Sequence, residues 1–228
     1  MGRILYEENT IKQELEISEF SNNSLSIRTF KMSSDVEVIL RTKMEEILDG
    51  YNKSSMLATL YTIIKELSIN ACKANQKRVF FEERGMDITD EDIYASGMKD
   101  YKKILNEENL DEYGDKCKRS GYYCLVTFSH NSDGMTVVVE NNTPIAYQEE
   151  RAIREKLSKA MRYDDIALFF VDNADNTEGA GLGLALIVIM LKGEGIDPRF
   201  FRIFTSEDIT LARLEIPFTD RFKSIRYQ

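Results

Sequence analysis

A helical pattern over residues 56–77, MLATLYTIIKELSINACKANQK, constrains the fold of this chain more than any other stretch. At about 100° per residue, its aliphatic side chains and alanines fall on one broad face, as expected for a helix that packs on a core. Beside that face, steps of four, three and four residues place a polar row: Glu66, Asn70, Lys73 and Lys77. The first three predict a binding site along the helix, whereas Lys77 is expected to be simply solvated.

Composition limits the classes of protein that this sequence can encode. The 228 residues are 43% hydrophobic and 30% charged, so we expect one domain that carries an insertion. No apolar run approaches the roughly 20 residues of a membrane span, and the N-terminus turns acidic before a signal-peptide core can form. We therefore expect a soluble, cytoplasmic protein with no membrane partner. The net charge of −9 argues against a nucleic acid as its main partner.

Cysteine and histidine offer little chemistry in this sequence. The three cysteines, Cys72, Cys117 and Cys124, are odd in number and lack the spacing of metal ligands. They predict ordinary buried or surface thiols rather than a disulfide framework or a zinc site. The single histidine, His130, lies in the turn sequence FSHNSDG and is expected at the surface, without a role as phosphoacceptor or metal ligand.

The order of local patterns predicts an α+β fold. Strands are expected in two hairpins and near the N-terminus, with one brief strand after the polar-row helix: 12–17, 24–30, 78–81, 122–129 with 135–140, and 199–205 with 209–217. Helices are expected over 36–48, 56–77, 148–163 and 184–191. The Asp133-Gly134 turn is a strong signal for the first hairpin. We predict a two-layer sandwich, with a mixed, largely antiparallel sheet covered on one face by helices.

Residues 82–117 differ in character from the rest of the chain. They carry twelve acidic and five basic side chains, which accounts for most of the net charge of −9. Their short apolar groups predict one or two surface helices. Two interpretations remain open: a solvated insertion, or a surface that docks a protein partner carrying a basic patch. Deleting the segment without loss of any partner would exclude the second.

A glycine-rich turn opens the apolar helix over 184–191. Gly179, Gly181 and Gly183 alternate with alanine and leucine. Glycines let the backbone approach a ligand closely, and the N–H groups of a helix start favour an anion. The pattern thus indicates a phosphate cradle, or alternatively a tightly packed helix cap. It lacks the spacing of a Walker loop, and it does not follow a strand as a Rossmann turn does.

The polar row suggests chemistry that complements a phosphate cradle. Glu66 and Asn70 lie one helical turn apart, so their side chains share one space. An amide oxygen can ligate Mg²⁺, a carboxylate can orient or deprotonate an attacking water, and Lys73 can neutralise phosphate charge. The alternative is a charged surface face with ordinary pairs at a spacing of four.

Together, the two motifs resemble one known family. Residues 66–74, ELSINACKA, resemble the N box of the histidine-kinase-like ATPases, the GHKL superfamily that includes sensor kinases, DNA gyrase and anti-sigma kinases. Residues 179–187, GAGLGLALI, are similar to the second glycine box of the sensor kinases. The order of elements agrees over 24–218 apart from the insertion, leaving 1–23 as an N-terminal segment and 219–228 as a tail. The resemblance implies a Bergerat-type fold.

The resemblance also implies roles for individual residues. It assigns Asn70 to Mg²⁺ and Lys73 to a phosphate, and it matches Glu66 to the acid that activates water in the hydrolysing branches. It places the phosphates of ATP or ADP under a lid at about 146–178. The expected contacts with these phosphates come from the second glycine box: Gly179, Gly181, Leu182 and Gly183.

The first glycine box of the family is altered in this chain. The family pattern is DxGxG, whose aspartate accepts a hydrogen bond from the adenine amino group; here residues 140–145 read ENNTPI. Aligned without gaps, Glu140 replaces the aspartate, while Asn142 and Pro144 replace the glycines. Either Glu140 or the carbonyl of Asn141 can accept the adenine bond. Pro144 lacks an N–H and fixes φ, so the loop is expected to bend differently.

Two functions are compatible with these features. No acceptor histidine on a dimerising helix precedes the domain, which is therefore expected to stand alone. The first function is a Mg-ATP-binding module that hydrolyses ATP or phosphorylates a separate protein in signalling, as anti-sigma kinases do. The second is a non-catalytic adaptor, in which a degenerate pocket survives as a scaffold and the insertion or the lid binds a protein partner.

Overall fold

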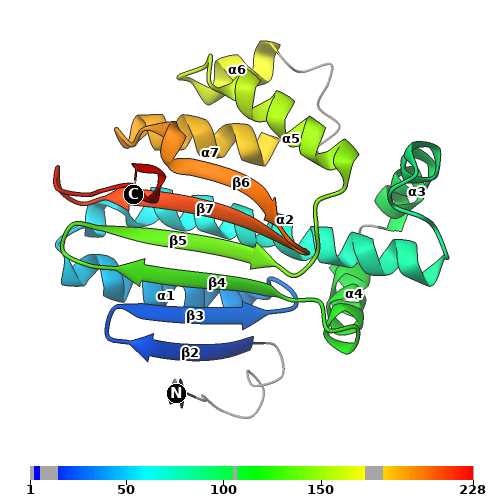
Figure 1. The fold of residues 1–228 in the computed structure, drawn as a ribbon, viewed down its shortest axis with the longest axis horizontal. Helices are drawn as coiled ribbons and strands as arrows, with labels where there is room; N and C mark the ends of the chain where they lie inside the picture. Colours follow the sequence, from blue (N-terminus) through cyan, green and yellow to red (C-terminus); the bar gives the residue numbers. More distant parts are fainter. Residues whose placement is uncertain (1–2, 6–14, 105–106, 173–181, 228) are drawn as a thin grey trace.

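The chain forms one antiparallel sheet with helices on one face (Figure 1). The computed structural model describes residues 3–5, 15–104, 107–172 and 182–227. Within these ranges the sheet has seven strands in the order β1-β2-β3-β4-β5-β7-β6. Every pairing in it is antiparallel, so the sheet is more regular than the mixed one expected. The predicted α+β sandwich is confirmed.

The strands follow the predicted hairpins closely. They are β1 (Arg3–Leu5), β2 (Leu15–Ser21), β3 (Ser24–Thr29), β4 (Cys124–His130), β5 (Gly134–Asn141), β6 (Phe201–Ser206) and β7 (Ile209–Pro217). Strand β5 lies between β4 and β7 in the sheet. Its odd-numbered residues Met135, Val137 and Val139 are buried in the main core. Because successive side chains alternate between faces, its even-numbered residues point away from the helices.

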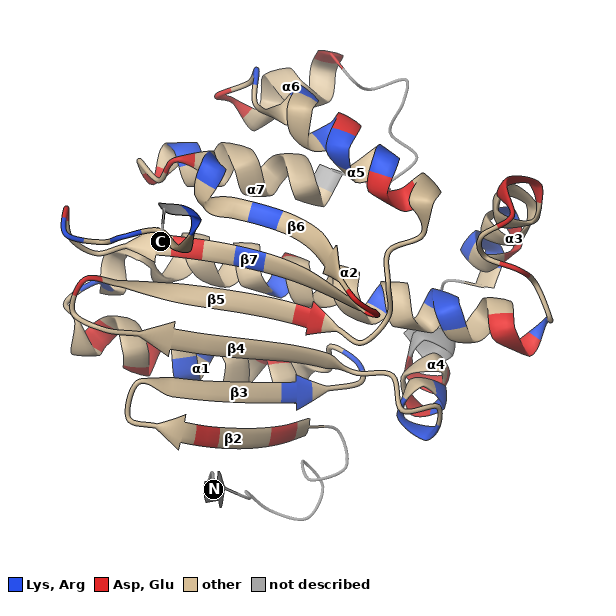
Figure 2. Ribbon diagram, in the orientation of Figure 1, with Lys and Arg blue, Asp and Glu red and all other residues tan. Residues whose placement is uncertain are grey.

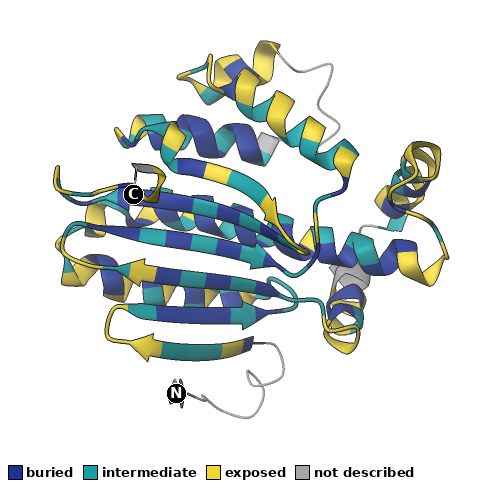
Figure 3. Cartoon of the chain, in the orientation of Figure 1, coloured by how far each residue is buried: buried dark blue, intermediate teal, exposed yellow. Residues whose placement is uncertain are grey.

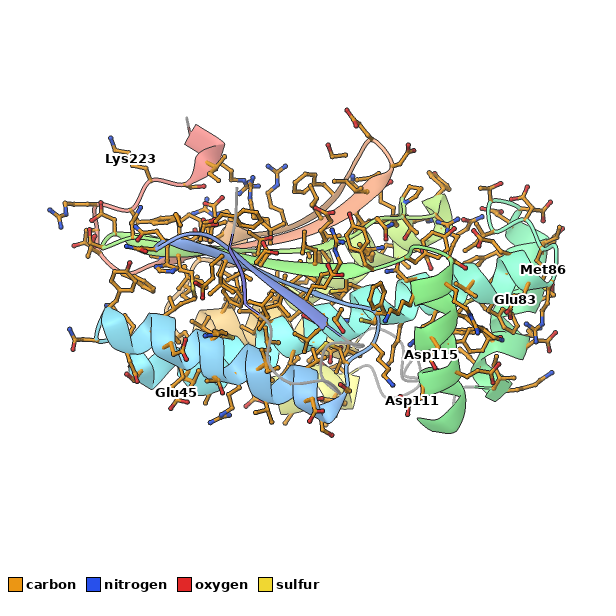
Figure 4. All side chains as sticks on the ribbon, turned by 90° about the horizontal axis from the view of Figure 1, so that it is seen from below. Glu45, Glu83, Met86, Asp111, Asp115 and Lys223 are labelled. Carbon is orange, nitrogen blue, oxygen red and sulfur yellow. The ribbon has the colours of Figure 1, made fainter. Side chains whose placement is uncertain are left out.

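The helices form the second layer. They are α1 (Ser34–Gly50), α2 (Leu57–Glu83), α3 (Glu91–Ile104), α4 (Glu107–Arg119), α5 (Tyr147–Ala160), α6 (Ile166–Asp172) and α7 (Leu182–Gly193), with short 3-10 turns at Ser54–Met56, Pro198–Phe200 and Ile225–Tyr227. Figure 4 views the two layers from the side, with the sheet above α1 and α2. None of the helices in the described ranges has the length and apolar character needed to cross a membrane.

Helix α2 is longer than the sequence predicted. It continues to Glu83, so the brief strand expected over residues 78–81 is wrong. Val79, Phe80 and Phe81 have high strand propensity, but here they pack in a buried cluster with side chains of the insertion. That burial outweighs the local preference, because strand propensity mainly reflects how side chains pack. The polar-row helix α2 and the insertion therefore pack as one unit.

The acidic insertion folds into two helices, as expected. Helices α3 and α4 stand at the end of α2, beyond the sheet (Figures 1 and 4). The ribbon in Figure 2 marks both acidic and basic residues along these two helices. Their inner sides pack on α2 through a separate hydrophobic cluster: Val79, Phe80, Phe81, Ile88, Tyr101, Tyr113 and Cys117. The insertion is thus a packed extension of α2 rather than a loose loop.

A glycine in α3 tests this packing. A Cβ atom on Gly97 would lie 2.5 Å from Cζ of Phe81, whose ring is enclosed in the cluster. We expect Gly97→Ala to lower the free energy of unfolding by about 1–3 kcal/mol, the usual cost of overpacking. In contrast, a Cβ on Gly50, at the end of α1, meets nothing within 4 Å. Urea denaturation of both alanine variants checks this, and equal stabilities would contradict the packing.

The main core lies between the sheet and α1, α2 and α7 (Figure 3). A second cluster joins α7 to α5 and α6 through Ala160, Phe169, Ala185, Val188 and Ile189. Because α7 is buried on two sides, its sequence is apolar around most of its circumference. Helix α7 therefore packs on both the main core and the cluster with α5 and α6.

The three cysteines are free and buried, as ordinary core thiols.

Candidate functional site

The predicted pair on α2 is formed. The Nδ2 atom of Asn70 donates a hydrogen bond to Oε1 of Glu66 over 3.0 Å. Both side chains are half-buried, one turn apart on the same side of the helix. Since the amide nitrogen faces the carboxylate, the amide oxygen of Asn70 is left to accept from, or ligate, another group.

The start of α7 meets this pair. A Cβ atom built on Gly183, the second residue of α7, would lie 1.8 Å from Oε1 of Glu66 and 2.5 Å from its Cδ. Only glycine fits there without moving the carboxylate. The N-terminal end of a helix favours negative charge, which suits the Glu66 side chain. Two motifs far apart in the sequence therefore lie in direct contact.

The other residues of the second glycine box are less fully placed. Gly179 and Gly181 lie outside the described residues, and Leu182 is placed only as the first residue of α7. Lys73 is exposed on α2, and its backbone carbonyl accepts a hydrogen bond from the Tyr101 hydroxyl of α3 over 3.3 Å. The insertion thus touches the polar row at Lys73, whose ammonium stays in solvent. Its contact with a phosphate remains a prediction.

Lys77 is not simply solvated, and that expectation is wrong. Its side chain is only 11% exposed and forms an ion pair with Glu149, in the first turn of α5. The Tyr94 hydroxyl of α3 donates to the same Glu149 oxygen over 3.0 Å. Burial, together with the nearby charge of Arg78, lowers the pKa of Lys77 to about 7. This contact ties the expected lid to α2 and to the insertion.

Replacing Glu149 should show how much the burial of Lys77 destabilises the fold when its ion-pair partner is absent. We expect Glu149→Gln to lower the free energy of unfolding by about 2–3 kcal/mol near pH 7, because the ammonium loses its partner. Glu155→Gln on the same helix is the matched control, since its pair with Arg151 is exposed and solvent screening leaves it little effect on stability.

The pH dependence of the Glu149→Gln variant follows from the Lys77 pKa. In the wild-type chain, burial and the nearby charge of Arg78 already hold the folded pKa of Lys77 near 7, well below the value of about 10.4 in the unfolded chain, and loss of the Glu149 carboxylate should lower it further. Between the folded and unfolded values the unfolded chain binds more protons, so both proteins should gain stability as the pH rises, and in the variant the gain should begin at a lower pH. Denaturant unfolding of both proteins from about pH 5 to pH 10 measures this gain, and a stability that does not rise with pH in either protein would contradict it.

Glu140 and Asn141 lie on opposite faces of the sheet. The Glu140 carboxylate accepts a hydrogen bond from the Tyr123 hydroxyl over 3.2 Å, on the face away from the helices. Asn141 is buried on the side of α2. Because side chains alternate along a strand, both cannot reach one site. This arrangement favours Asn141 over Glu140 as the acceptor on the α2 side, and the contact of either residue with a base stays a prediction.

Asn141 belongs to a buried polar cluster that the sequence reasoning missed. The cluster comprises Asn75 of α2, Asn141 at the end of β5, Thr143 just after β5, and Thr210 of β7. We call it the amide–hydroxyl cluster. Asn141 Nδ2 donates to Thr143 Oγ1 over 2.8 Å, and the Thr210 hydroxyl donates to the Thr143 carbonyl over 2.6 Å. Asn75 lies about half a turn around α2 from Glu66, on the core side. The sequence signal for this cluster was Asn75, a polar residue on the otherwise apolar, core-facing side of the helix.

Side chains hold the altered glycine box in place. Asn142 Oδ1 accepts from the Tyr123 amide over 2.7 Å, and Asn142 Nδ2 donates to the Gly121 carbonyl over 2.8 Å. Arg78 donates to the Pro144 carbonyl over 2.8 Å. No residue from 141 to 145 has a positive φ. The loop is therefore fixed by amide and guanidinium contacts where the family pattern uses glycine.

The donor set for a metal is small. In the described part of the chain, no group of three or more His, Cys, Asp and Glu side chains could hold a metal ion. Mg²⁺ commonly takes one or two protein ligands and completes its shell with phosphate oxygens and water. The amide oxygen of Asn70 fits that role, so a magnesium site here would depend on a bound nucleotide.

Comparison with known proteins finds a relative of this chain. The chain is 33% identical over 193 residues to a protein of Treponema pallidum (strain Nichols) whose printed name is "Uncharacterized protein". The match covers 85% of this chain and 37% of that protein, so the chain spans little more than a third of its relative. No family model matches the chain, and no solved structure matches it.

Proposed function

We propose that this chain binds Mg-ATP, or ADP, as a histidine-kinase-like domain. The observation that carries the proposal is the contact of the Glu66–Asn70 pair with Gly183 at the start of α7. An acidic group, an amide and a helix N-terminus at one place form a suitable setting for a metal-bound triphosphate. The resemblance of both segments to family motifs, in the same order along the chain, supports the same assignment.

Each residue has a distinct role in this proposal. Asn70 holds Mg²⁺ through its amide oxygen, and the backbone N–H groups at the start of α7, beside the Glu66 carboxylate, bind the phosphates. Lys73, exposed one turn beyond Asn70, balances phosphate charge. Asn141 lies on the α2 side of the sheet and is assigned to the base. Bound Mg-ATP supplies the reactive phosphoanhydride.

Glu66 is the residue assigned to catalysis. One of its oxygens accepts from Asn70, and the other is available to orient or deprotonate a water molecule. Hydrolysis and phosphorylation of a separate protein are both open to such a site. We place the activity in the cytoplasm, where ATP is abundant and thiols stay reduced, in agreement with three free cysteines.

A thermal-shift assay tests nucleotide binding. At a free Mg-ATP concentration about 100 times the dissociation constant, binding should stabilise the folded chain by about 2.7 kcal/mol. The unfolding temperature should rise with Mg-ATP, and it should rise less with ATP plus a chelator. Mg²⁺ alone is the control. An unchanged unfolding temperature at millimolar Mg-ATP would contradict the proposal.

The adaptor function remains the second candidate because α6 exposes apolar side chains. Leu168, Phe170 and Val171 are 60%, 43% and 74% exposed on this short helix. Exposed apolar groups in one place favour contact with a protein. If a partner binds the Gly183→Val variant as well as wild type but does not bind Leu168→Asp, the adaptor function is favoured over a nucleotide-dependent one.

A further inference from the structure

We infer that the insertion latches the start of α5, so that this end of the helix opens away from α2 only when its polar contacts with the insertion break. The inference goes beyond the proposed function, because the latch needs no nucleotide. It gives the insertion a task within this chain, separate from any docking of a protein partner.

The Glu149 carboxylate joins three helices. Its Oε1 atom accepts a hydrogen bond from the Tyr94 hydroxyl of α3 over 3.0 Å and pairs with the Lys77 ammonium of α2. Its Oε2 atom accepts from the Ala146 backbone N–H over 3.4 Å, at the start of α5 itself. The Glu149 side chain is only 17% exposed, so water competes little for these contacts. One carboxylate therefore attaches the first turn of α5 to both α2 and the insertion.

Tyr94 is held in place on the insertion side of this contact. Its ring stacks on the Phe81 ring near the end of α2, with the ring centroids 5.9 Å apart and the planes at 29°. Phe81 is buried in the hydrophobic cluster that joins α2 to the insertion. Burial raises the pKa of Tyr94, so its hydroxyl stays protonated and able to donate. The Tyr94 hydroxyl is thus a positioned donor to which α5 attaches.

The residue before Glu149 makes a second contact with the insertion. The side-chain amide of Gln148 donates to the backbone carbonyl of Thr89 over 3.1 Å, in the loop just before α3. A carbonyl can only accept, so the amide nitrogen of Gln148 must face it. Two adjacent side chains of α5 therefore contact the insertion, one through its loop and the other through α3.

The first half of α5 lacks apolar anchors among the described residues. The hydrophobic clusters include this helix only from Ile153 onward, through Ile153, Leu157 and Ala160. Tyr147, the first residue of α5, is 71% exposed. Segments with few buried apolar contacts open at a lower free energy than the whole fold. Residues 147–152 therefore depend on the polar latch, whereas 153–160 belong to the packed core.

Native-state amide hydrogen exchange of the full chain without nucleotide tests the latch. Tyr94→Phe removes the hydroxyl and keeps the ring that stacks on Phe81. In this variant the amides of residues 147–152 should exchange about tenfold faster, as expected for the loss of one hydrogen bond to a carboxylate. Gln148→Ala should accelerate the same amides about fivefold, because the bond that it removes has an uncharged acceptor.

Tyr122→Phe is the matched control. The Tyr122 hydroxyl also donates to a carboxylate, but that carboxylate belongs to Glu82 of α2 rather than to α5. This variant should leave the exchange of residues 147–152 at the wild-type rate. Equal acceleration in Tyr122→Phe and Tyr94→Phe would overturn the inference.

The urea dependence of the exchange separates a latch from a general contribution to stability. Local opening exposes little surface, so its exchange rate hardly changes at low urea, whereas exchange through global unfolding accelerates steeply. The latch predicts that Tyr94→Phe accelerates the urea-independent exchange of residues 147–152. Acceleration confined to the urea-dependent exchange would overturn the inference, as would wild-type rates in both Tyr94→Phe and Gln148→Ala. Since no nucleotide is present, failure of Mg-ATP binding would leave this result unchanged.

Discussion

Gly183→Val should abolish Mg-ATP binding while the fold persists. A Cβ at this position would lie 1.8 Å from Oε1 of Glu66, so the valine must displace the carboxylate and its hydrogen-bonded partner Asn70. It would also cover the backbone at the start of α7. We expect the dissociation constant to rise at least about 100-fold, equivalent to about 2.7 kcal/mol. Fluorescence titration with a labelled nucleotide measures the change.

Stability should change little in the same variant. The atoms that must move belong to the end of the Glu66 side chain, so the free energy of unfolding should fall by no more than about 1 kcal/mol. Gly193→Val, at the other end of α7, is the matched control, because a Cβ there meets nothing within 4 Å. Unaltered nucleotide affinity in Gly183→Val would show that this contact lies outside the site.

Asn70→Ala should weaken nucleotide binding in a magnesium-dependent way. The substitution removes the proposed metal ligand and the partner of Glu66. We expect about 100-fold weaker binding of Mg-ATP and a much smaller effect on ATP measured with a chelator. Asn70→Asp keeps an oxygen ligand and should retain more affinity than alanine. An equal loss with and without Mg²⁺ would contradict the assignment of Asn70 to the metal.

The layers of the fold could be predicted because their signals are short-range. The Asp133-Gly134 turn and alternating strands define the hairpin of β4 and β5, and helical periodicity defines α2. The end of α2 could not be predicted in this way. Residues 78–81 resemble a strand until Phe80 and Phe81 are placed against the insertion helices. Their conformation is decided by tertiary contacts.

The site was predictable in part for the same reason. The spacing of Glu66 and Asn70 indicates their pairing, and the family resemblance leads one to look for Gly183 beside them. The choice between Glu140 and Asn141 depends on strand register, since a shift by one residue reverses the face. Asn75, Thr143 and Thr210 come from three separate segments, and Lys77 meets Glu149 only through packing of the expected lid.

Calorimetric titration of Mg-ATP into wild type and into Gly183→Val tests the central claim most directly. The contact of Glu66 and Asn70 with the start of α7 predicts saturable heat for one nucleotide per chain in wild type and none in the variant. A wild-type chain that gives no heat at millimolar Mg-ATP would contradict nucleotide binding and leave the adaptor function standing.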